Sequence, residues 1–172
     1  GGALENRLRV HLEIMAAVVR GVAGRGLAGM RMSQSRSNDF NHKWAGGVDD
    51  AKAIFEALAG AGADYIHVST HQGLGEEFDS GHTLAGLARE YAGVPVIACG
   101  KLEDPSSGEQ LLAAGEADLV AIARGAIGDP SWPDKLAKGE APVAFAPEMI
   151  SPFATLDATD AWRTANGVTF GG

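Results

Sequence analysis

The chain has 172 residues, of which 45% are hydrophobic and 21% charged, and this is enough apolar material for a buried core. Its 14 lysines and arginines against 22 aspartates and glutamates give a formal net charge of −8. That balance argues against nucleic acid and against a membrane surface as partners, because both favour a basic protein. Cys99 is the only cysteine, so no internal disulfide can form and a reducing, cytoplasmic compartment is expected. No apolar run approaches the roughly 20 residues of a membrane helix.

Apolar periodicity divides the first 140 residues into alternating helices and strands. Leu8, Leu12, Met15 and Val19 recur at helical spacing and define the buried face of the first helix. The expected helices span residues 4–20, 49–61, 83–91, 107–114 and 132–138. The expected strands span residues 27–32, 65–69, 94–99 and 119–123. A long polar loop is expected over 33–47, and loops of this length inside compact domains are usually functional or disordered.

Strict alternation of strands and helices is typical of βαβ units around a parallel sheet. No strand is followed by Gly-x-Gly-x-x-Gly, so a barrel is favoured over a dinucleotide-binding sheet. A complete barrel needs about 250 residues. The sequence therefore predicts an α/β fold, half of a (β/α)8 TIM barrel with about four parallel strands, over residues 1–140. Residues 141–172 hold three prolines and no clear period, and are expected to form a tail on or beside the barrel.

A phosphate site is predicted at the ends of the last two strands, which run into Gly100-Lys101 and Arg124-Gly125. Glycine lets backbone N–H groups approach an anion, and a guanidinium adds a bidentate charged donor. Taken singly, Gly100 is explained by a tight turn and Arg124 by a solvated surface charge. Their joint position on adjacent strand ends favours phosphate binding, as barrels often bind phosphate there.

Arg31 is a second candidate, because it interrupts an apolar strand between Met30 and Met32. A charge at such a position is costly unless it has a partner. Spacing alone leaves two partners equally open, an electron-rich ligand in the barrel mouth or a carboxylate from the other half of the barrel.

The remaining polar candidates carry weaker signals. No pair of histidines has the spacing of a metal site, and His11 and His42 look exposed. Cys99 is expected to be a small apolar core residue. Gln34, Trp44 and His71 are candidates for a substrate pocket only because they lie in or beside the long loops.

An ordered series of segments resembles the Old Yellow Enzyme family of FMN-dependent oxidoreductases. The segments are Gly1-Gly2-Ala3-Leu4-Glu5-Asn6-Arg7, Met30-Arg31-Met32-Ser33, Asp64-Tyr65-Ile66-His67-Val68-Ser69, Pro95-Val96-Ile97-Ala98-Cys99-Gly100, Ala117-Asp118-Leu119-Val120-Ala121-Ile122-Ala123-Arg124 and Asp129-Pro130-Ser131-Trp132-Pro133. The resemblance extends from Gly1 to about Gly139 and implies that the chain is the C-terminal half of the barrel.

The resemblance implies FMN as cofactor, NAD(P)H as reductant and an activated alkene as substrate. Arg31 resembles the arginine near N1 and the C2 carbonyl of the flavin, which stabilises the negative charge of the reduced ring. Gly100 and Lys101 resemble the backbone amides that hold the FMN phosphate, and Arg124 resembles the arginine that pairs with it. Ala123 stands where many members have glycine, and should still present its backbone N–H.

The family's catalytic residues, a His-His or His-Asn pair and a tyrosine, would lie upstream of Gly1. No catalytic residue is therefore assigned, the isolated chain is expected to be inactive, and the N-terminal half of the barrel is its expected partner. Exposed edge strands predict that the isolated chain self-associates, and a homo-oligomer is a further option. Two other functions remain open from the residues: a phosphate-binding lyase or isomerase without flavin, and a non-catalytic half-barrel used for binding or assembly.

Overall fold

A computed structural model describes residues 2–36 and 38–168, and the chain forms two compact units, Gly1–Ala121 and Ile122–Gly172. The predicted start of the barrel at Gly1 and the last four residues of the predicted tail lie outside the described residues. The division into a barrel half over 1–140 and a tail over 141–172 stays a prediction. Each unit is described below by itself.

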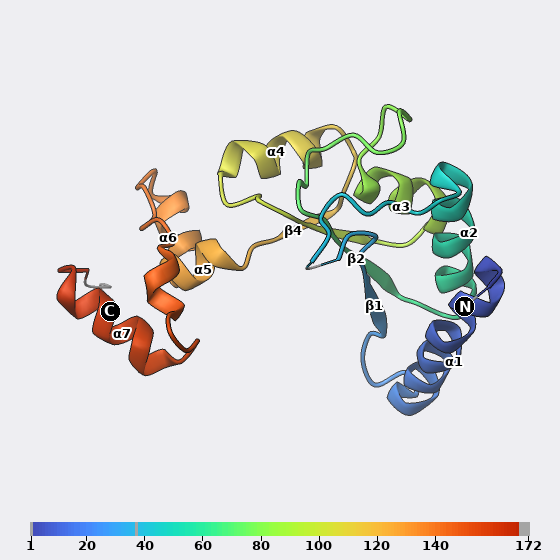
Figure 1. The fold of residues 1–172 in the computed structure, drawn as a ribbon, viewed down its shortest axis with the longest axis horizontal. Helices are drawn as coiled ribbons and strands as arrows, with labels where there is room; N and C mark the ends of the chain where they lie inside the picture. The colour runs from blue at the N-terminus through green and yellow to red at the C-terminus, as the bar shows by residue number, and fades with distance from the viewer. Residues whose placement is uncertain (1, 37, 169–172) are drawn as a thin grey trace. The chain divides into compact units, whose positions relative to one another are not determined.

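The first unit alternates helices with parallel strands, as the sequence predicts. Its elements are α1 (Leu4–Val22), β1 (Gly29–Met32), α2 (Gly47–Gly60), β2 (Tyr65–Ser69), α3 (Leu84–Ala92), β3 (Val96–Cys99), α4 (Pro105–Ala113) and β4 (Leu119–Ala121). The strands form one four-stranded sheet in the order β1-β2-β3-β4, and every neighbouring pair is parallel. Figure 1 shows α1 to α4 following one another along one side of this sheet. The predicted α/β alternation is confirmed.

Side chains of the sheet alternate between two unlike faces, because successive residues of a strand point to opposite sides. On one face, Ile66, Val68, Val96 and Ala98 are fully buried in the core that the helices share. Burying each of the isoleucine and valine side chains stabilises the fold by about 1.5–3 kcal/mol, and burying the smaller Ala98 contributes less. This face attaches the sheet to its helices.

The opposite face, called the open face below, consists of the residues of alternate parity. They are Gly29 and Arg31 of β1, Tyr65, His67 and Ser69 of β2, Ile97 and Cys99 of β3, and Leu119 and Ala121 of β4. None of them is fully buried, and Leu119 is 56% exposed. In a closed barrel this face would point inward. Cys99, expected to be a small apolar core residue, is half-buried on this face, in register with Ser69 and Ala121.

The two outer strands of the sheet have free edges. Neither β1 nor β4 pairs with a further strand among residues 2–36 and 38–168. Such edges offer unpaired N–H and C=O groups to another strand. Self-association of the isolated chain therefore stays a prediction.

Among the helices that the structure describes, none has the length and apolarity required to span a membrane.

The second unit is helical and only partly matches the sequence prediction. It contains α5 (Arg124–Gly128), α6 (Trp132–Ala137), a 3-10 helix η1 (Pro147–Ile150) and α7 (Leu156–Ala165). Of these, the sequence predicts only α6, since α5 is too short to show a period and residues 141–172 show no clear apolar period. The predicted strand over 119–123 ends at Ala121, so Ile122 and Ala123 lie outside it.

Buried Asp129 organises the start of this second unit. Its side chain is fully buried and accepts hydrogen bonds from Lys135 Nζ at 2.6 Å, Val143 N at 2.8 Å and Ser131 N at 3.0 Å. Burial by itself raises the pKa of the Asp129 carboxyl, but these hydrogen bonds and the Lys135 charge outweigh it, so the pKa is lowered. The carboxylate thus joins α6 to the segment at residue 143.

The N-terminus of α3 is closed by a carboxylate from the turn after α4. Thr83 caps the helix through Gly86 N, while Glu116 accepts from Thr83 N and Thr83 Oγ1, both at 2.7 Å. His82 Nδ1 lies 2.8 Å from the other oxygen of Glu116. A Cβ on Gly86 would overlap the Glu116 carboxylate. Glycine at position 86 therefore makes room for the group that links α3 to α4.

We predict that Gly86→Ala destabilises the fold by about 1–2 kcal/mol, the cost of displacing Glu116 from its hydrogen bonds to Thr83. The matched control is Gly21→Ala in α1, where an added Cβ meets nothing within 4 Å. That change should be neutral or stabilising by up to about 1 kcal/mol, because alanine favours helix. Urea unfolding of both variants measures the difference, and equal effects would contradict the role of Gly86.

A second prediction concerns the pH dependence of the His82–Glu116 pair. The hydrogen bond with Glu116 raises the pKa of His82 above its usual 6.5, with smaller contributions from Glu90 and Glu76 and against the effect of desolvation. His82 therefore contributes stability that is present below its unfolded-state pKa and is lost as pH rises through its raised folded-state pKa, whereas Glu116, whose pKa is lowered, loses its contribution as pH falls. Glu116→Gln should lower the His82 titration midpoint toward 6.5, as followed by NMR. An unchanged midpoint would show that Glu116 does not set it.

Candidate functional site

The carboxyl ends of the four strands lie at one edge of the sheet, because all the strands are parallel. The long loops that follow β1 and β2, and the turn that follows β3, therefore start from this same edge. In barrels of this kind, function collects on the loops after the strands. Three features of the first unit lie at or near this edge of the sheet: Arg31, the Gly100–Lys101 turn and a cavity between the two long loops.

Arg31 lies on the open face of the sheet, and its side chain is exposed. Its Nη2 donates a hydrogen bond to Ser69 Oγ at 2.7 Å. No carboxylate in the part of the chain that the structure describes forms an ion pair with it. The charge is thus fixed by a neutral hydroxyl and not compensated within this unit, which leaves it available to a ligand or to residues outside this chain.

His67 is the neighbour of Arg31 across the strands, in register with it. Burial lowers the pKa of His67 below 6.5, and the positive charge of Arg31 lowers it further. The ring is therefore neutral at pH 7. Its Nε2 is buried and has no hydrogen-bond partner among the described residues. The sequence indicated only that His67 sits on a strand, and the unpaired nitrogen follows from the packing of the sheet.

The turn after β3 has two consecutive residues with positive φ. Gly100 and Lys101 have φ values of 145° and 52°. A Cβ at Gly100 would overlap the Thr70 carbonyl oxygen and lie 2.8 Å from Thr70 Oγ1, so only glycine fits. The Gly100 carbonyl accepts from Gly73 N at 2.7 Å, which joins this turn to the loop after β2. Within the described chain, neither the Gly100 nor the Lys101 N–H donates to another protein group, so both can face a ligand.

Ala123 and Arg124 belong to the second unit, while Gly100 and Lys101 belong to the first. Ala123 is the residue before α5, and its carbonyl accepts from Ile127 N at 3.0 Å. Arg124 begins α5 and is exposed, so the two residues follow β4 at a helix start and not on a strand end as predicted. A joint phosphate site of Gly100, Lys101 and Arg124 stays a prediction.

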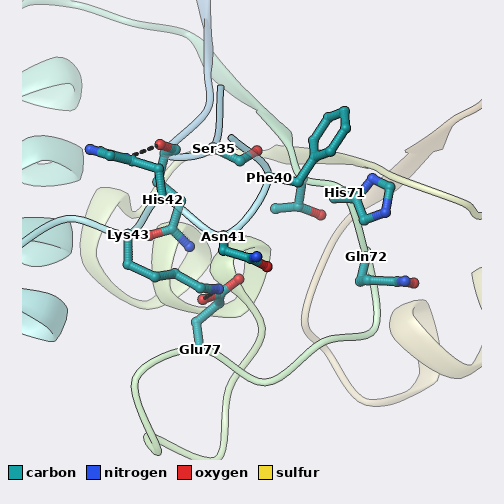
Figure 2. Close-up of a pocket in the computed structure, with 10 residues that line it drawn as sticks. Ser35, Phe40, Asn41, His42, Lys43, His71, Gln72 and Glu77 are labelled. Carbon is teal, nitrogen blue, oxygen red and sulfur yellow. Dashed lines mark hydrogen bonds and ion pairs between the residues drawn. The ribbon is translucent and has the colours of Figure 1, made fainter. Parts of the chain in front are cut away.

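A cavity of about 150 Å³ lies between the loops that follow β1 and β2 (Figure 2). It is lined by Gln34, Ser35, Phe40, Asn41, His42, Lys43, Thr70, His71, Gln72 and Glu77. This volume is comparable to cavities that bind a single six-membered ring. The sequence pointed to Gln34 and His71 by their location, and both do line the cavity.

Trp44, the third residue suggested by location, does not line the cavity. Its ring packs edge-on against Phe55 of α2, with ring centroids 5.9 Å apart. Its backbone N–H lies 3.4 Å from Gln34 Oε1. Trp44, a candidate by its location near the end of a polar loop, thus packs against the adjoining helix and is not among the residues that line this cavity.

The cavity walls combine stacked rings with a neutralised charge pair. Phe40 and His71 stack with centroids 4.5 Å apart and an interplanar angle of 24°. Lys43 forms an ion pair with Glu77, whose side chain is buried, and Figure 2 shows the two side chains meeting. Amide groups of Asn41 and Gln72 complete the lining. Such a surface suits a flat, polar but uncharged molecule better than an anion.

Gln34 and His42 hold the inner side of this cavity. Gln34 is only 4% exposed, and its Nε2 has no partner among the described residues. His42 Nδ1 lies 2.7 Å from the Gln34 carbonyl, and its Nε2 lies 2.9 Å from Arg36 Nη2. The expectation that His42 is exposed is therefore wrong.

No group of histidine, cysteine or acidic residues in the described part of the chain is arranged to hold a metal ion.

Comparison with known proteins gives consistent results from sequence and from structure. The model of the NADH:flavin oxidoreductase / NADH oxidase family matches residues 1–142. An NADH oxidase from Thermoanaerobacter brockii is 31% identical over 150 residues, which are 81% of this chain and 22% of that protein. The chain thus spans about a fifth of that curated relative.

Solved structures share the fold of this chain. Morphinone reductase in complex with tetrahydroNAD superposes with a TM-score of 0.74 at 25% identity, over 93% of this chain and 42% of that one. The old yellow enzyme from Trypanosoma cruzi gives a TM-score of 0.70 at 15% identity over 86% of this chain, a likeness of fold alone. The predicted partial barrel is thereby confirmed. The ordered motifs, the parallel sheet and the match over residues 1–142 show that this chain belongs to the NADH:flavin oxidoreductase / NADH oxidase family, which confirms the resemblance to Old Yellow Enzyme.

Proposed function

We propose that this chain forms the C-terminal part of the FMN site in an NAD(P)H-dependent oxidoreductase that reduces activated C=C bonds, such as those of α,β-unsaturated carbonyl compounds. The observation that carries the proposal is Arg31, a cation without a carboxylate partner in the described chain, held on the open face at the functional edge of the sheet. The activity belongs to the longer protein, since this chain spans 42% of morphinone reductase.

The residues of the first unit fit a phosphate-bearing cofactor. The N–H groups of Gly100 and Lys101 donate to no protein group in the described chain, and the turn keeps its conformation because Gly100 has no Cβ to overlap Thr70. Consecutive N–H groups in a turn with positive φ form a concavity for anions. Gly100 and Lys101 would therefore bind the FMN phosphate.

Arg31 fits the other end of the cofactor, the electron-rich ring. A fixed guanidinium close to developing negative charge stabilises the reduced form more than the oxidised form. FMN, when bound, would supply the hydride transfer between the nicotinamide and the alkene. The chain's own contribution is to orient the ring through Arg31 and to hold the phosphate. Catalytic proton donors are not assigned to any residue of this chain.

The cavity between the loops is the proposed place for the reacting molecule. Its size suits one ring, and the stacked Phe40 and His71 offer a flat apolar surface. The Lys43–Glu77 pair cancels its own charge, so the cavity does not repel or select an ionised substrate. These properties suit a neutral cyclic enone or the ring of a nicotinamide.

The first test of this function is to measure FMN in the purified protein that carries this chain and in its Arg31→Ala variant. We expect bound FMN in the parent, and a loss of flavin affinity of roughly 10- to 100-fold in the variant, the cost of removing a charged hydrogen-bond donor. Arg9→Ala, on the exposed surface of α1, is the charge-matched control and should leave affinity unchanged. A flavin-free parent would favour a non-flavin phosphate-binding enzyme instead.

A further prediction concerns the phosphate end of the site. Gly100→Ala forces a Cβ against Thr70 and should displace the turn, which lowers FMN affinity by more than about tenfold through lost N–H contacts. Gly93→Ala is the control, since Gly93 also has positive φ, at 65°, but an added Cβ meets nothing within 4 Å. It should cost stability without changing FMN affinity in equilibrium titrations. Equal affinities in the two variants would remove Gly100 from the phosphate site.

A further inference from the structure

Ser69 holds the guanidinium of Arg31 from the adjacent strand. Arg31 and Ser69 lie on the same face of the sheet, because Arg31 is in register with His67 and Ser69 follows two residues later. The bond from Arg31 Nη2 to Ser69 Oγ is 2.7 Å long, a short distance for a nitrogen donor. Both residues belong to regular strands, so neither backbone end of this contact is in a loop.

This contact restricts a side chain that would otherwise move. A free arginine side chain samples many rotamers, and a planar guanidinium held at one nitrogen samples fewer of them. Serine has a single short torsion, so its hydroxyl is fixed by the strand itself. The hydrogen bond engages one N–H of the five that the guanidinium offers, and the remaining donors can still meet a ligand.

The chemical type of this anchor matters as much as its position. A carboxylate would hold Arg31 more strongly but would also cancel its charge toward a ligand. A hydroxyl fixes the guanidinium and leaves its charge uncompensated. His67, the in-register neighbour, adds no opposing or competing charge, because burial and Arg31 itself lower its pKa and keep it neutral at pH 7.

We propose that Ser69 is a positioning residue, whose hydroxyl orients Arg31 toward the flavin ring without neutralising it and so favours the reduced state of bound FMN. The inference rests on the proposed function, since it assumes a flavin at Arg31. It adds a residue that acts through Arg31 and that does not itself touch the ring.

The test measures the FMN midpoint potential in the flavin-loaded protein that carries this chain. Ser69→Ala should weaken binding of reduced relative to oxidised FMN about three- to tenfold, and tenfold equals about 30 mV for a two-electron couple. Ser69→Thr keeps the hydroxyl on a strand and should retain the parent potential. Ser33→Ala is the matched control, because Ser33 Oγ contacts Ser35 and not Arg31, although it lies two residues from Arg31.

A double-mutant cycle separates positioning from a general structural effect. If Ser69 acts through Arg31, then Ser69→Ala has no further effect on the potential in an Arg31→Ala background. A shift that persists in that background, or no shift in Ser69→Ala alone, overturns the inference while the proposed function stands. A parent protein that binds no FMN overturns the proposed function, and the role of Ser69 with it.

Discussion

The burial of one face of the parallel sheet against its helices is the constraint on which the rest of the first unit depends. Ile66, Val68, Val96 and Ala98 are almost completely excluded from solvent, and they fix which way each strand faces. A shift of register by one residue would move every side chain of a strand to the other face. In β1 it would press the charged Arg31 into the apolar core. The aliphatic packing thus sets the direction in which Arg31 points.

Parallel strand direction then gathers the polar features at one edge of the sheet. The loops after β1 and β2 enclose the cavity, and the Gly100 turn after β3 touches the loop after β2 through Thr70 and Gly73. These segments are distant in sequence, and besides lining the site they send Trp44, Phe78 and Leu102 toward the core. They meet because consecutive βα units place every strand end on the same side. The loops of the candidate site therefore also pack against the core of the scaffold.

The charged residues discussed above fall into two groups, those paired with a buried carboxylate and those without a carboxylate partner. Lys43 with Glu77, and Lys135 with Asp129, pair a cation with a buried carboxylate, and these pairs link segments of the chain. Leaving one member unpaired would be costly, so their role is structural. Arg31 differs, since it donates a hydrogen bond to the hydroxyl of Ser69 and forms no ion pair with a carboxylate of the described chain. A cation held in this way is available to a ligand or to residues outside this chain, and its role in flavin binding stays a proposal.

Periodicity and motif order were sufficient to determine the alternation of helices and strands, the parallel half-barrel, the family and the prominence of Arg31 and Gly100. These properties are local, because the spacing of apolar residues decides an element and glycine decides a turn. The sequence did not predict α5, whose five residues are too few to show a period, or α7, which lies in a stretch without a clear apolar period. Only the tertiary structure decided that Ser69 anchors Arg31, that Lys43 meets Glu77 and that Trp44 enters the core. Each of these contacts joins residues far apart in sequence, and packing of the sheet and loops, which no local pattern encodes, brings them together.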